Sequence, residues 1–140
     1  MTLSAEQQSF VDAIRKPMNS HRASLLNKRF DAIPREERFG ALLHLFTSAN
    51  DYAAQQKCSR FLPEVLADCV LPLDCVLRQI ASTWNLSVEE LPTFLAKVYG
   101  VENVIETCGT LELQYGDDTY ERRALNTIAW WLKPRLNQVG

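Results

Sequence analysis

The sequence contains few of the residues that interrupt regular structure, with 5 Gly and 6 Pro among 140 residues. This content excludes a collagen-like repeat and a low-complexity disordered chain. Only two histidines are present, and the four cysteines form neither a C-x-x-C pair nor a zinc-binding spacing. We therefore expect no metal, no cofactor and four free thiols, at Cys58, Cys69, Cys75 and Cys108.

Long hydrophobic runs are also lacking. The most apolar segments, residues 42–46 and 65–81, are interrupted by polar or charged residues such as His44 and Asp68. Neither segment approaches the roughly 18 apolar residues that a membrane-spanning helix needs. The first residues show no basic stretch followed by the apolar core of a secretory signal. We therefore expect a cytoplasmic protein that does not interact with a membrane.

The motifs of common catalytic sites are missing as well, because the chain has no Gly-rich phosphate loop, no G-x-S-x-G turn and no helix with paired histidines. Tyr115–Asp118 reads Tyr-Gly-Asp-Asp, a metal-binding tetrad of RNA-copying polymerases. A chain of 140 residues cannot supply the rest of a polymerase, and a turn followed by a helix cap explains both aspartates. We expect no enzymatic activity.

The composition that is present fits one folded unit. Hydrophobic residues make up 46% of the chain and charged residues 23%, and the length matches one domain over residues 1–140. A domain of this size buries about two-thirds of the surface that its unfolded chain exposes, so its core needs neither metal nor disulfide.

The net charge of −2 conceals an uneven distribution. Residues 1–60 carry nine Lys or Arg against six Asp or Glu, residues 61–120 carry two against ten, and residues 121–140 carry four against one. The three nets are +3, −8 and +3. An acidic middle segment repels phosphate, which disfavours a nucleic acid as partner. We favour neutralisation between the segments within the fold.

Apolar residues recur with helical spacing along almost the whole chain, which predicts a mainly α-helical single domain, a bundle of six to seven short helices. The expected helices are one opened by the capping box Ser4–Gln7, one over Ala23–Phe30, one that begins at Ile33–Pro34, one capped by Asn50 or Asp51, Leu73–Trp84, Val88–Tyr99 and one capped by Asp118 with Glu121.

The sixth of these helices carries the most explicit local signal. Ser87 and Glu90 have the spacing of a capping box, and Gly100 has the position of a left-handed terminator. After Gly100, two interpretations of residues 101–116 remain open. Alternation over Thr110–Tyr115 predicts a strand that pairs with Val104–Thr107 in a small β-hairpin, whereas residues 101–107 also fit a helical turn.

Residues 77–96 have the apolar spacing of two helices that meet at a corner. Ile80, Trp84, Leu91 and Phe94 occupy apolar positions of this pattern, and Asn85 stands where a glycine with positive φ usually makes the turn. The segment resembles the helix-turn-helix motif, over 20 of 140 residues and without indicating a particular family. The resemblance implies a tight corner of two helices and, in DNA-binding members, a second helix that contacts base edges.

Several residues of the second helix oppose DNA binding. Glu89 and Glu90 would approach the phosphates, and Pro92 removes a backbone donor one turn into the helix. Ser87 and Thr93 are the residues suited to contact DNA. A helix-turn-helix transcriptional regulator is therefore the alternative interpretation rather than the leading one.

The last predicted helix carries the leading functional candidate. Trp130 falls on its polar side, about 100° from the following residue and among Arg123, Asn126 and Lys133. Trp and Arg are the side chains most often found at interface hot spots. We expect a regulatory or interaction protein that binds a protein partner through these residues and through an acidic surface at Glu89, Glu90 and Glu102, with a homodimer as the simplest case.

Overall fold

The computed structural model describes residues 2–17 and 20–138. Within these residues it confirms the mainly α-helical class but contains eight α-helices, where six to seven were expected. In chain order these are α1 (Ala5–Ile14), α2 (Ser20–Ala32), α3 (Arg35–Ser48), α4 (Tyr52–Ser59), α5 (Leu73–Ile80), α6 (Glu90–Tyr99), α7 (Val101–Glu112) and α8 (Tyr120–Leu132), with 3₁₀-helices η1 (Leu62–Val65) after α4 and η2 (Lys133–Gln138) after α8.

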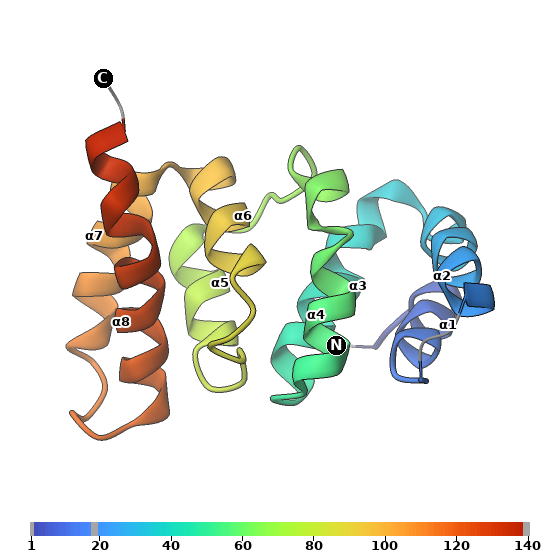
Figure 1. Cartoon of the computed structure of the whole chain (residues 1–140), viewed down its shortest axis with the longest axis horizontal. Helices are drawn as coiled ribbons and strands as arrows, with labels where there is room; N and C mark the ends of the chain where they lie inside the picture. The colour runs from blue at the N-terminus through green and yellow to red at the C-terminus, as the bar shows by residue number, and fades with distance from the viewer. Residues whose placement is uncertain (1, 18–19, 139–140) are drawn as a thin grey trace.

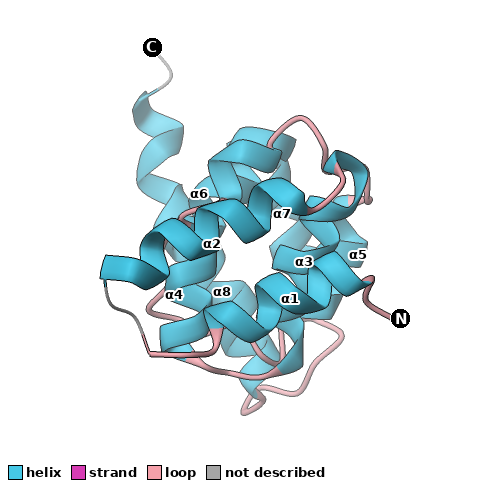
Figure 2. Ribbon diagram, turned by 90° about the vertical axis from the view of Figure 1, so that its right-hand side faces the viewer, coloured by secondary structure: helices cyan, strands magenta, loops and turns pink. Residues whose placement is uncertain are grey.

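The helices follow one another along the long axis of the molecule. Figure 1 shows α1 and α2 at one end and α7 and α8 at the other, and Figure 2 shows the same row end-on. The odd-numbered helices pack in succession, α1 on α3, α3 on α5 and α5 on α7. Most packing therefore joins neighbours in a row, on a small scale like the stacked helix pairs of α-solenoids, rather than all helices around one centre.

The predicted hairpin is wrong, because the structure places α7 over residues 101–112 and has no strand among the residues it describes. Val104, Cys108 and Leu111 are spaced for one helical face, and all three are buried. Gly100 has a φ of 91° and turns the chain directly from α6 into α7. Helical spacing over the buried residues thus outweighs the short alternation that suggested a strand.

The expected caps are confirmed at two helices and wrong at two. The Ser4 hydroxyl accepts a hydrogen bond from Gln7 N at 3.2 Å, and an Asp51 oxygen accepts one from Ala54 N at 3.2 Å. In contrast, α6 begins at Glu90 without a Ser87 cap, and Thr119 rather than Asp118 caps α8. The Glu90 side chain accepts hydrogen bonds from α4, so it does not form a capping box with Ser87.

The connection between α5 and α6 is longer than the turn expected for residues 77–96. Helix α5 ends at Ile80 and α6 begins at Glu90, whereas a helix-turn-helix corner has a turn of three or four residues. Asn85 does not have the positive φ expected of it, because no residue other than glycine has one in the described chain. Trp84 is fully buried in this connection and donates from Nε1 to Val88 O at 3.1 Å. The connection is therefore a packed loop instead of the short turn of a helix-turn-helix corner.

Candidate functional site

The exposed side of α8 is the first candidate site. Helix α8 packs against α7 at the end of the row and buries one side into the core. The opposite side presents Trp130, 63% exposed, in a stripe with the exposed side chains of Arg123, Asn126 and Lys133. The structure thus brings the four predicted residues onto one face.

Charge is not uniform along this face. Arg123 and Asn126 line a shallow depression together with Asp117 and Asp118, and Arg122 forms an ion pair with Asp117 at 2.7 Å. Carboxylates therefore offset the positive charge at the beginning of α8.

At the end of α8, Trp130, Trp131, Lys133 and Pro134 line a second depression. The rings of Trp130 and Trp131 meet edge to face, with centroids 5.1 Å apart. The cationic and aromatic character expected of the whole face is concentrated at this end, where Lys133 lies beside the indoles.

The predicted acidic surface is smaller than expected. Glu89 and Glu102 are exposed, but Glu90 is half-buried and turned toward α4. Its Oε2 accepts a hydrogen bond from Ser59 Oγ at 3.2 Å and another from Gln56 Nε2. Glu90 therefore does not belong to the outward acidic surface, because the first turn of α6 directs it at the end of α4.

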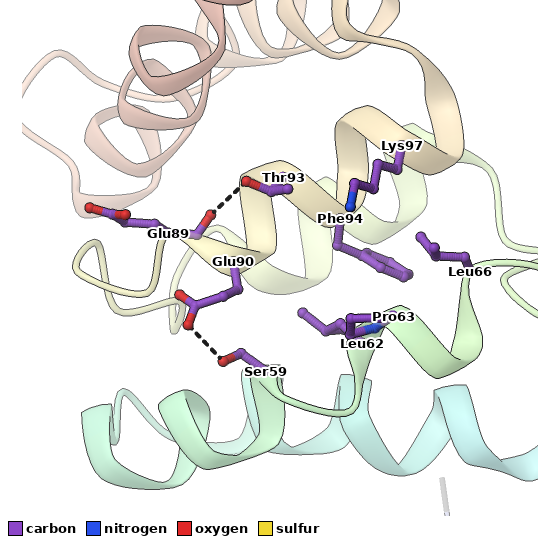
Figure 3. A pocket seen from close by; sticks show the side chains of 9 residues that line it. All are labelled: Ser59, Leu62, Pro63, Leu66, Glu89, Glu90, Thr93, Phe94 and Lys97. Carbon is purple, nitrogen blue, oxygen red and sulfur yellow. Dashed lines mark hydrogen bonds between the residues drawn. The ribbon is translucent and has the colours of Figure 1, made fainter.

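A pocket lies between the end of α4, η1 and α6 (Figure 3), and the sequence patterns did not predict it. It has a volume of about 200 Å³. Its lining consists of an apolar group, an acidic end and a basic end: Leu62, Pro63, Leu66 and Phe94, then Ser59, Glu89, Glu90 and Thr93, then Lys97. Glu90, Phe94 and Lys97 have helical spacing along α6, but only the tertiary fold supplies the opposite wall from η1.

The residues proposed for DNA contact occupy different environments. Ser87 is exposed in the connection before α6, and its backbone N donates to Asn85 Oδ1 at 3.0 Å. Thr93 is half-buried in α6, and its hydroxyl accepts a hydrogen bond from Arg135 Nη2 of η2 at 2.9 Å. Thr93 therefore already has a partner within the chain.

Burial is the main cause of the pKa shifts of two cysteines and one histidine in the described chain. Burial raises the pKa of the Cys58 thiol well above its ordinary value, and burial with the nearby Glu112 raises the pKa of Cys108 to about 12. Partial burial, followed by the charge of Arg15, lowers the pKa of His44. Within residues 2–17 and 20–138, no three His, Cys, Asp or Glu side chains are grouped as metal ligands.

No helix in the described ranges is both long and apolar enough to cross a bilayer.

Comparisons with known proteins add no family, since no family model, curated protein or solved structure is significantly similar to the chain. The site itself is therefore the basis for assigning function.

Proposed function

We propose that this protein is a non-catalytic interaction protein that binds a protein partner through the exposed face of α8. One observation carries the proposal: the indole of Trp130 is 63% exposed between the flanking charged and polar side chains of the same stripe. An exposed Trp leaves a large apolar area in water, and burying it against a partner recovers that free energy. Trp and Arg dominate the binding energy of many protein interfaces.

Self-association is the simplest form of this function. The end of α8 and the residue that follows it contribute Trp130 and Lys133, and the same chain exposes Glu89, directly before α6, and Glu102 on α7. Contact between the cationic end of α8 and these carboxylates of a second copy would pair opposite charges around a buried indole. A stable interface of this kind buries about 800 Å² on each partner, so the four residues of the stripe would form its centre.

Sedimentation velocity over a range of protein concentrations tests the proposal. We expect the wild-type chain to dimerise and the double variant W130A/R123E to sediment as a monomer. Tyr52→Ala with Arg60→Glu is the matched control, because it removes an exposed aromatic and reverses an exposed cation on and beside α4. Self-association is refuted by a monomeric wild type at the highest concentration, or by equal loss of the dimer in both double variants.

The alternative function is DNA binding by a helix-turn-helix regulator through Ser87 and Thr93. Arg135, hydrogen-bonded to Thr93, is the contact that favours it, because it puts a cation beside α6. Binding of random duplex DNA that weakens steeply as salt rises would support this function. Lack of any mobility shift at low salt would remove it.

A further inference from the structure

We propose that the pocket between η1 and α6 binds the side chain of an arginine from a protein partner, with the guanidinium at Glu90 and the stem along the apolar wall. This site lies apart from the stripe on α8, and the proposal does not depend on the function proposed for that stripe.

The carboxylate of Glu90 is held in position but only partly used. Its Oε2 accepts from Gln56 Nε2 and lies 3.2 Å from Ser59 Oγ, whose single hydrogen is shared with Gln56 O at 2.6 Å, and these contacts hold the carboxylate toward α4. Oε1 accepts no hydrogen bond from any residue that the structure describes, and no described cation forms an ion pair with Glu90. An ionised carboxylate accepts about four hydrogen bonds, so two positions are free for a ligand. A fixed acceptor also lowers the entropic cost of binding.

The rest of the pocket fits the stem of a long side chain. Leu62 and Phe94 are each 3% exposed and form the deep part, and Leu66 packs against the core beside them. The methylene stem of arginine covers apolar surface of this kind while its charged head stays polar. The planar guanidinium can donate two parallel hydrogen bonds to a carboxylate and is more weakly hydrated than the lysine ammonium, so Glu90 favours arginine over lysine.

Charge sets the direction of the ligand. Lys97 lies seven residues after Glu90 on α6, so their Cα atoms are about 10 Å apart along the helix axis, and the Lys97 side chain extends back over Phe94 (Figure 3). It repels a cation at its end of the pocket, so the positive group goes to Glu90. The volume of about 200 Å³ lies below the usual range of small-molecule sites, which is about 300 to 1,000 Å³. A single side chain presented by a protein partner suits this volume.

An NMR titration of the full-length ¹⁵N-labelled chain tests the proposal. The probe is N-acetyl-arginine-N′-methylamide, and N-acetyl-citrulline-N′-methylamide is its uncharged counterpart of the same shape. We expect the arginine probe to shift the amide signals of Ser59, Glu90 and Phe94 to saturation, and the citrulline probe to bind at least tenfold more weakly.

Two isosteric variants locate the binding group. Glu90→Gln should weaken binding of the arginine probe at least tenfold, because the substitution removes the negative charge. The amide oxygen of the substituted side chain still accepts from Ser59. Glu106→Gln removes an equal charge from an exposed residue of α7 that does not line the pocket, and should change the affinity less than twofold.

Three results would overturn the proposal: equal affinity of the wild type for both probes, an equal loss of affinity for the arginine probe in the two variants, or shifts of amide signals confined to residues outside the pocket. Because the probe comparison uses the wild-type chain, it decides the matter even if E90Q folds poorly. Sedimentation of W130A/R123E reports on the α8 interface, whereas the arginine probe reports on the pocket, so failure of one proposal is distinguishable from failure of the other.

Discussion

The buried side chain of Gln55 joins two loops, and its loss should destabilise the whole domain. Gln55 is 0% exposed, and its Nε2 donates to Ala49 O at 2.9 Å and to Thr83 O at 2.8 Å. Its Oε1 accepts from Asn85 N at 2.8 Å. Leucine at this position has a similar size but makes none of the three hydrogen bonds. At about 1 kcal/mol for each bond, Gln55→Leu should lower the free energy of unfolding by about 3 kcal/mol.

Urea unfolding followed by circular dichroism measures this loss. With a slope of about 2 kcal/mol/M, the midpoint should fall by roughly 1.5 M urea while the slope stays unchanged. Gln79→Leu, an exposed position on α5, is the matched control and should change stability by less than about 0.5 kcal/mol. A loss below about 1 kcal/mol for Gln55→Leu would refute the view that this side chain holds the connection between α5 and α6.

Two further predictions concern backbone conformation and titration. Gly100→Ala should destabilise the fold by about 1 kcal/mol, because Gly100 has a φ of 91°. Gly109→Ala should stabilise the fold by about 0.5 to 1 kcal/mol, because Gly109 lies in exposed, open surroundings of α7. The urea midpoints of the two variants check these signs, and a stabilising Gly100→Ala would contradict the role given to the positive φ. The folded Cys108 has a pKa of about 12 against an ordinary value of 9.0, so the unfolded chain loses this proton first and stability should fall as the pH rises above about 9. Unfolding at pH 8 and pH 10.5 should show a smaller alkaline loss for Cys108→Ala than for the wild type, and equal losses would refute the assignment.

Local sequence signals succeed where a residue acts within its own helix. The cap at Ser4, the cap at Asp51 and the positive φ of Gly100 depend on groups no more than a few residues apart. Likewise, the exposure of Trp130 follows from the angle between residues on one helix. These features need no knowledge of what packs against the helix.

The same signals fail where a side chain has a choice between a local and a distant partner. Glu90 has the spacing of a capping residue but accepts hydrogen bonds from α4 instead. Residues 110–115 alternate like a strand, yet the burial of Leu111 with the preceding residues of its helical face favours α7. In both cases the competing interaction comes from residues that are distant in the chain or from the packing of a whole helix.

By itself, the sequence determined the helical class, most helix positions and the stripe of α8, because the 3.6-residue period and the first-turn caps are properties of short segments. Only the tertiary structure decided the row of helices, the packed loop between α5 and α6 and the pocket at Glu90. Its opposing walls come from residues 59–66 and 89–97, and no periodicity within either segment specifies that they meet. Their meeting depends on burying the apolar sides of several helices at once, which is a property of the whole chain.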